Sequence, residues 1–320
     1  MKKLFLFLFL FLFLSLCSHA QTAWSGFKWG HDSITVNNQR AFVPRSAIFL
    51  PVSFEGDPRR YYLQLDLSSN IPLLLYGLPT SIDNKRVNNQ SFNSNKLNNC
   101  FRISTTLKGT LGNEDFSLDS AQYCLMRRNN DTSKSYTAST FTAIIGTIGL
   151  NYFLNKTLIV DFPHQQFMVL DDTTKVPPRF KKSFFYVPAH VSNSRLLVPV
   201  TFGDTTFNDF FYETGSGIFD MMTSKKTWKK LTGKTGDEKE NYHVKVTAWG
   251  NKLDAIGAPS KSPLRVGNIV MPVAMVFYLS GDEAFKDTYG CDGMIGNSPF
   301  LGKVIVFDFR RNRFGMFNPL

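Results

Sequence analysis

Two stretches of this 320-residue chain repeat one pattern 147 positions apart, and this repeat limits the fold more than any other feature. The window 146–167 matches 293–314 at nine of 22 positions without a gap, where ordinary residue usage gives about one or two. The matches include two glycines, an aspartate and three phenylalanines. Two copies with a domain-sized period favour two similar lobes over a solenoid.

The same offset relates two carboxylates at the ends of apolar runs. Asp66 ends the run 61–66, Glu213 ends the run 210–213, and small residues follow each of them. These patterns are typical of a buried strand that enters a tight turn. Because a carboxylate there is costly to desolvate unless it is hydrogen-bonded or functional, Asp66 and Glu213 are the candidate site residues.

The secondary-structure signals are mostly those of strands. Apolar and polar residues alternate between turn signals over much of the chain, and the one clear helix, 224–233, has a serine cap and a glycine stop. We predict an all-β fold with few short helices. The predicted divisions are an N-terminal arm, an N-terminal β lobe, an interlobe linker and a C-terminal β lobe, at 21–44, 45–170, 171–190 and 191–320.

Taken together, the motifs resemble those of the pepsin-type aspartic peptidases. In that family each lobe carries an Asp-Thr-Gly-Ser turn, then an apolar-apolar-Gly segment, then Val/Ile-x-Asp-aromatic. The first lobe matches at 144–149 and 159–162, and the second at 293–297 and 305–309. The resemblance spans about residues 45–320 and implies two pseudo-two-fold related β lobes. It also implies a cleft where Asp66 and Glu213 meet, and neither cofactor nor metal.

Neither turn keeps the whole family pattern. The first reads Asp66-Leu67-Ser68-Ser69 and the second Glu213-Thr214-Gly215-Ser216. Leu67 lacks the hydroxyl that ties the two turns in the family, and Ser68 adds a side chain where glycine lets the backbone approach the carboxylate. The glutamate carboxylate stands about one ångström farther out, and such a misplacement can cost on the order of a hundredfold in rate. We therefore expect a widened pair, or Leu67 between the carboxylates.

Three hypotheses for the function remain open. The favoured one is a catalytically lapsed homologue that binds a peptide or another extended ligand in the cleft. The second is an active endopeptidase in which Asp66 and Glu213 share a proton and activate water. The third is a structural cell-envelope protein with a vestigial cleft. The sequence therefore leaves open whether the chain is an enzyme.

The first twenty residues are typical of a secretory signal peptide. Lys2 and Lys3 precede the Leu/Phe-rich run 4–16, and Ser18-His19-Ala20 offers a cleavage point. Cys17 suggests a lipoprotein, but Leu16 stands before it where a small residue is required. We expect a secreted or periplasmic protein, without a transmembrane segment in the later chain.

The remaining signals concern cysteines, charge and partners. Cys100 and Cys124 flank an apparent hairpin and are the expected disulfide, whereas Cys291 is expected as a buried thiol. No Cys/His spacing resembles a metal site. The net charge of +11 is scattered, which disfavours nucleic-acid binding. We expect a monomer, and the resemblance places a covering flap within residues 100–124, with its tip at 105–110.

Overall fold

The computed structural model describes ten segments of the chain: residues 24–79, 87–91, 100–126, 144–171, 176–177, 180, 184–248, 251–271, 273–280 and 290–317. The predicted signal peptide and the lipoprotein cysteine lie outside the described residues. Within the described segments, no helix is long and apolar enough to cross a membrane.

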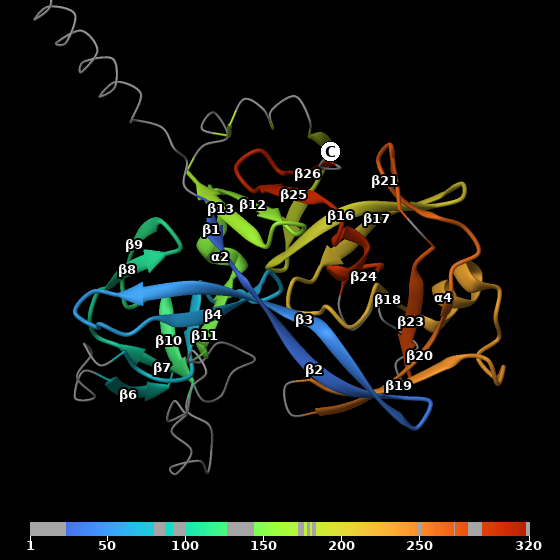
Figure 1. The fold of residues 1–320 in the computed structure, drawn as a ribbon, viewed down its shortest axis with the longest axis horizontal. Helices are drawn as coiled ribbons and strands as arrows, with labels where there is room; N and C mark the ends of the chain where they lie inside the picture. The colour runs from blue at the N-terminus through green and yellow to red at the C-terminus, as the bar shows by residue number, and fades with distance from the viewer. Residues whose placement is uncertain are drawn as a thin grey trace, which may run out of the picture.

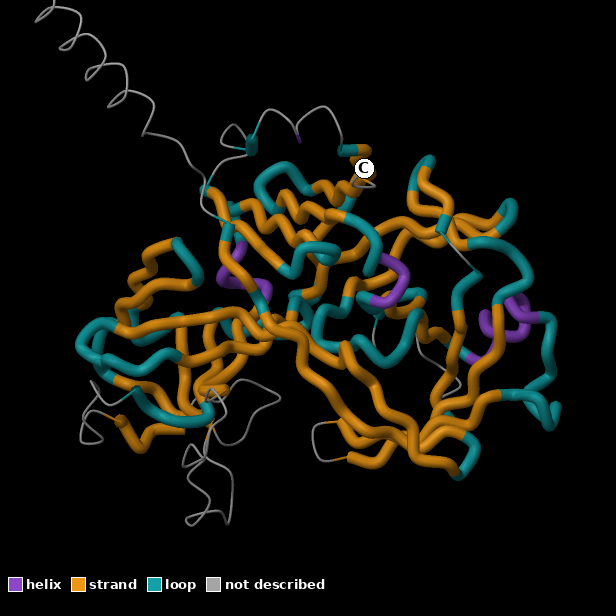
Figure 2. The backbone as a smooth tube through the Cα atoms, viewed as in Figure 1, coloured by secondary structure: helices purple, strands orange, loops and turns teal. Residues whose placement is uncertain are grey.

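The described chain consists mostly of strands, which confirms the all-β class (Figures 1 and 2). The first half contains β1 Ser25–Gly26, β2 Lys28–Val36, β3 Gln39–Phe54, β4 Tyr61–Asp66, β5 Leu73–Leu75, β6 Val87–Ser91, β7 Cys100–Ile103, β8 Leu107–Leu111, β9 Glu114–Leu118, β10 Tyr123–Met126, β11 Ile144–Gly149, α2 Leu150–Phe153, β12 Thr157–Asp161 and β13 Gln166–Leu170. The second half contains β14 Phe185–Pro188, β15 His190–Ser192, β16 Arg195–Phe202, β17 Thr205–Tyr212, β18 Met221–Thr223, α4 Lys225–Thr232, β19 Tyr242–Ala248, β20 Asn251–Pro259, β21 Leu264–Val266, β22 Ile269–Val270, β23 Met275–Leu279, β24 Gly293–Ile295, η3 Ser298–Phe300, β25 Val304–Asp308 and β26 Arg313–Phe317.

The strands that carry the two carboxylates have the same neighbours in both halves. β4 pairs in parallel with β11, which also pairs antiparallel with β5. β17 pairs in parallel with β24, which also pairs antiparallel with β18. The parallel register repeats at the offset of 147, because Leu65 lies opposite Ile148 and Tyr212 lies opposite Ile295.

The two turns differ in length by one residue. Ile148 lies opposite Leu73 in the first half, whereas Ile295 lies opposite Met221 in the second. The ungapped offset predicts residue 220 at that place. The chain therefore takes one more residue to pass from Glu213 into β18 than from Asp66 into β5.

A six-stranded sheet joins the two halves, in the order β1-β13-β12-β25-β26-β14. Its central strands β12 and β25 pair antiparallel, with Ile159 opposite Val306. These two residues are themselves related by the offset of 147, so a local pseudo-two-fold axis passes between them. The pairing thus places the two halves in equivalent positions about this axis.

Several segments differ from the sequence-based expectation. Residues 28–36 of the predicted arm form β2, which pairs with β3 along its length. Within the predicted linker, β14 pairs with β26. Within the segment where the resemblance places a flap, β8 pairs with β3 and with β9. The predicted helix at 224–233 is α4, which buries Trp228 and ends at Gly233 in a left-handed conformation.

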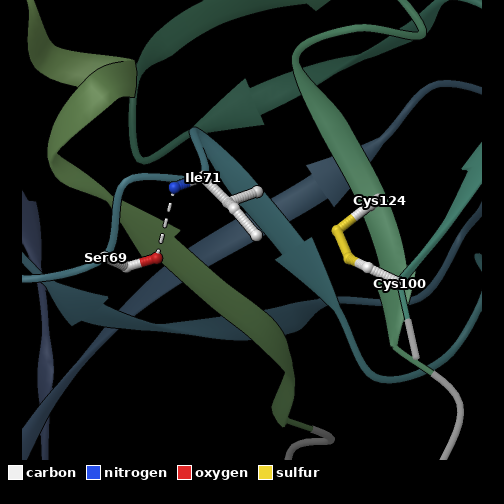
Figure 3. Close-up of a disulfide and its surroundings, with 4 residues drawn as sticks. All are labelled: Ser69, Ile71, Cys100 and Cys124. Atoms are coloured by element: carbon white, nitrogen blue, oxygen red, sulfur yellow. Dashed lines mark hydrogen bonds between the residues drawn. A yellow bond between two sulfur atoms is a disulfide. The ribbon is translucent and has the colours of Figure 1, made fainter. Parts of the chain in front are cut away.

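The structure joins Cys100 and Cys124 by a disulfide, with their Cα atoms 5.7 Å apart (Figure 3). Both residues are buried and pack with Ile71 and Leu74 in one apolar cluster. Ile71 follows the Asp66 turn, where its N–H donates to Ser69 Oγ at 3.4 Å. The disulfide therefore braces the strand that leaves the first turn. Cys291 is a buried free thiol, and burial raises its pKa to about 11.

Candidate functional site

Both turns hold their carboxylate in the same way. Asp66 Oδ1 accepts a hydrogen bond from the N–H of Ser68 at 2.9 Å, and Glu213 Oε1 accepts one from the N–H of Gly215 at 2.7 Å. In each case the donor is two residues after the carboxylate. These hydrogen bonds stabilise ionised carboxylates and keep them at the ends of their strands.

The residues that follow β11 and β24 donate hydrogen bonds to the two turns. Leu150 N–H donates to Ser69 carbonyl oxygen at 2.9 Å, and Asn297 N–H donates to Ser216 carbonyl oxygen at 3.3 Å. At the preceding Gly296, an added Cβ would lie only 2.6 Å from Ser216 O, and the equivalent Cβ at Gly149 only 2.5 Å from Ser69 O. The repeated glycines are thus explained by the close approach of the turn carbonyls.

One hydroxyl still ties the two turns together. Thr214 is fully buried, and its Oγ1 donates to the carbonyl of Leu65 at 3.1 Å and accepts from the N–H of Leu67 at 2.9 Å. Leu67 is also fully buried but can make no reciprocal bond from its side chain. It packs in the apolar core instead, so it does not lie between the carboxylates. The side-chain hydrogen bonds between the two turns are therefore made by Thr214, without a counterpart from Leu67.

The two carboxyl groups interact directly. Burial, then the negative charge of Asp66 and, least of the three, a hydrogen bond with Asp66 raise the pKa of Glu213 to about 8. Hydrogen bonds from Ser68 and from the Gly215 N–H act in the opposite direction, because they stabilise the charged form. At neutral pH Glu213 therefore holds a proton.

Ser68 has a second contact that the family's glycine cannot make. Its hydroxyl donates to Asp66 Oδ1 at 2.7 Å, and it lies close enough to Glu213 to lower the pKa of that carboxyl as well. A single hydroxyl group thus contacts both carboxyl groups. Its one hydrogen is donated to Asp66, so the hydroxyl takes up a place beside both groups without bridging them as a two-donor water molecule would.

Sequence reasoning missed three side chains that shape this site. An added Cβ on Gly215 would lie 2.9 Å from Glu213 Oε1, 3.3 Å from Gln64 Nε2 and 3.5 Å from Asp66 Cγ. The Gln64 amide therefore lies beside the Gly215 turn, on the same side as both carboxyl groups. The available signal was its spacing, because residues two apart on a strand share a face.

The other two side chains, Tyr212 and Asn297, hold the second turn. The Tyr212 hydroxyl donates to Asn297 Oδ1 at 3.2 Å, and Asn297 Nδ2 donates to the carbonyl of Thr214 at 2.8 Å. The equivalent positions of the first half are Leu65 and Leu150, and all four residues are fully buried. The second turn therefore has a polar support where the first has an apolar one.

The raised pKa of Glu213 predicts how stability depends on pH. The folded chain keeps this proton up to about pH 8, whereas the unfolded chain releases it near pH 4.5. The native state thus binds more protons in this window, so the free energy of unfolding falls as the pH rises through it. We expect Glu213→Gln to lose much of this fall, measured by urea unfolding at about pH 5 and about pH 8.

Asp204→Asn is the matched control, because Asp204 is an exposed residue in a turn of the same half. This variant should keep the parent's dependence on pH. Equal falls in stability for the parent and Glu213→Gln would show that the two carboxyl groups are not coupled in the folded chain.

Among the described residues, no group of histidine, cysteine and acidic side chains could hold a metal ion. No protein-family model and no curated protein matches the chain. Solved structures do match it over most of its length. Conglutin gamma, a basic 7S globulin from lupine seeds, is 10% identical with a TM-score of 0.48, over 91% of this chain and 96% of that one.

Two further structures have similar values. The basic 7S globulin from soybean is 9% identical with a TM-score of 0.45, over 92% of this chain and 95% of that one. The aspartic proteinase from Irpex lacteus is 14% identical with a TM-score of 0.43, over 90% and 97%. In all three cases the match extends over at least 90% of both chains.

Proposed function

We propose that this chain is an exported, pepsin-like bilobal protein that binds an extended peptide between its lobes without hydrolysing it. The observation that carries the proposal is the Ser68 hydroxyl, which contacts both Asp66 and Glu213. In a carboxylate dyad the nucleophile is a water molecule bound by both groups. Because Ser68 already makes these hydrogen bonds, a water molecule gains little by binding there.

The longer side chain of Glu213 works in the same direction. Its carboxyl group accepts a hydrogen bond from the N–H of Gly215 and interacts with Asp66. The hydrogen-bonding capacity of the two carboxyl groups is therefore used by each other and by Ser68. Peptide binding requires less of this site than hydrolysis does. An extended ligand needs hydrogen-bonding groups and apolar contacts along its length, but no nucleophile in a fixed position.

One observation favours a second candidate, an active endopeptidase. Burial and the charge of Asp66 raise the pKa of Glu213 to about 8, which provides a protonated carboxyl near neutral pH. Such a pair can act as acid and base in peptide hydrolysis. The two candidates differ in whether a hydroxyl on the ligand can replace Ser68 between the carboxylates.

A pair of matched peptides distinguishes the candidates. One contains statine, whose hydroxyl mimics the attacking water, and the other has the same sequence without that hydroxyl. We expect the purified chain to bind both with equal affinity in calorimetry and to cleave neither a denatured protein nor a peptide mixture between about pH 3 and about pH 8.

An active dyad gives the opposite result. The statine peptide would then bind at least about a hundredfold more tightly, as transition-state analogues do, and Asp66→Asn would abolish that preference. If neither peptide binds and nothing is cleaved, the interlobe region is vestigial and the binding proposal is wrong.

A further inference from the structure

The β2–β3 hairpin begins in the first half of the chain, but its tip lies on the second half (Figure 1). At the tip, β2 pairs antiparallel with β19, with Val36 opposite Val244 and Thr35 opposite Lys245. β19 also pairs with β20, so the hairpin extends a sheet of the second half. The hairpin therefore connects the two halves outside the six-stranded sheet.

The contacts at the tip are specific but few. Asn37 N–H donates to the carbonyl of His243, and the N–H of His243 donates to Asn37 Oδ1, both at 2.8 Å. Ile34 and Val36 pack, partly buried, on an apolar cluster that includes Phe211, Phe219 and Val244. Phe211 and Phe219 flank the Glu213 turn. The tip thus rests on the core beneath that turn.

A β-bulge divides the hairpin between its base and its tip. Gly30 lies opposite Ala47, but the next pair joins Asp32 to Val43, so residues 44–46 oppose His31 alone. A bulge interrupts the ladder of hydrogen bonds and bends the strand. Here it frees the carbonyl of Ser46, which accepts a hydrogen bond from the N–H of Gly217 at 2.8 Å.

The bulge therefore touches the turn that carries Glu213. The fit is close, because an added Cβ on Gly217 would overlap the carbonyl oxygen of Arg45. The hairpin is thus attached to the second half at two places along its length. The tip is held by β19, and the bulge is held by the Glu213 turn.

We propose that the β2–β3 hairpin is a strap whose docking on β19 holds the bulge against the Glu213 turn and limits access to the Asp66–Glu213 pair. Among the described residues, undocking requires the loss of two residue pairs, the Asn37 contacts and the packing of Ile34 and Val36, a small fraction of the contacts in the fold. Such local openings occur far more often than global unfolding. The bulge is the hinge, since its residues are already released from the ladder with β2.

A disulfide between the tip and β19 tests the strap. Val36→Cys and Val244→Cys place cysteines on directly opposed residues, at a spacing that disulfides accept. The readout is the rate at which a bulky carbodiimide with glycine ethyl ester labels Glu213, relative to exposed Asp204, measured by mass spectrometry. We expect oxidation to slow the labelling of Glu213 by about tenfold or more, because the open state is lost.

A cross-link within the hairpin is the matched control. Ser33→Cys with Phe42→Cys joins opposed residues of β2 and β3 but leaves the tip free to leave β19. Oxidation of this control should not slow the labelling. Mild reduction should restore the rate of Glu213 labelling in the protein with the Val36–Val244 cross-link. The parent treated with the same reductant shows any effect of reducing the native Cys100–Cys124 disulfide.

A variant with a more weakly held tip tests the proposal independently, without a new disulfide. Asn37 has a φ of 49°, so Asn37→Gly keeps the turn and removes the Oδ1 acceptor for His243. We expect Glu213 to be labelled several-fold faster in this variant, and the Gly217 amide to exchange faster with deuterium. Labelling at the parent's rate in both the cross-linked protein and Asn37→Gly would show that the hairpin is a fixed brace and would overturn the proposal. This readout involves no peptide, so it is independent of the binding proposal.

Discussion

A chain carrying Leu67→Thr, Ser68→Gly and Glu213→Asp is expected to hydrolyse peptides that the parent leaves intact. Each change removes one departure at the site. Threonine at 67 can return the interlobe hydrogen bond, glycine at 68 removes the hydroxyl that contacts both carboxylates, and aspartate at 213 retracts its carboxylate by one methylene. Together they should leave two short carboxylates around a free water site.

The expected gain is at least about a hundredfold over the background of the parent, since displacements of about an ångström have effects of that size on rate. It is measured as peptide-bond cleavage by mass spectrometry across acidic and neutral pH. The activity should be inhibited by a statine peptide and lost when Asp66→Asn is added to the triple variant.

Single changes separate the contributions. We expect Leu67→Thr alone to gain no activity, because the Ser68 hydroxyl remains between the carboxylates. Ser68→Gly should contribute the largest part of the gain. Robust cleavage by the parent, sensitive to the statine peptide and abolished by Asp66→Asn, would show instead that Asp66 and Glu213 already form a working pair.

The repeat in the sequence predicted the part of the fold that depends on local pattern. Glycines, carboxylates and apolar runs that recur 147 positions apart form β4 and β17, β11 and β24, and the central pair β12 and β25. The extra residue after Glu213 was not visible, because the offset is restored before β24. Glycines 149 and 296 could be located from the repeat, but the reason for them needed the turn carbonyls.

Other features depend on contacts that leave no local pattern. The tip of the β2–β3 hairpin pairs with a strand about 200 residues later in the chain. Nothing in the sequence around His243 indicates that its backbone is hydrogen-bonded to Asn37. The same holds for Leu67, whose side chain between the carboxylates was one of the two arrangements that the sequence predicted. A leucine gains more by packing in the core than by standing beside two carboxylates, so the backbone turns it inward and leaves Ser68 at the site.

Thr214→Val is expected to give the largest loss of stability among single changes at the site. Valine matches threonine in shape but has no hydroxyl, so the buried N–H of Leu67 and the buried carbonyl of Leu65 both lose their partner. An unsatisfied buried polar group costs about 1–3 kcal/mol, and the two together should lower the free energy of unfolding by about 4 kcal/mol. Urea unfolding measures this loss.

The control is Thr206→Val on β17, where the hydroxyl contacts only Thr201 Oγ1 at an exposed place, and its expected effect is within about 0.5 kcal/mol. A second variant, Thr214→Ser, keeps the hydroxyl and should recover most of the stability.

Since Thr214 contacts the turn of the other half, its loss should also weaken the contact between the carboxyl groups. The fall in stability between about pH 5 and about pH 8 should then become smaller in Thr214→Val, because the pKa of Glu213 depends in part on the charge of Asp66. An unchanged dependence on pH, with stability equal to that of Thr206→Val, would show that the tie contributes nothing to holding the two turns together.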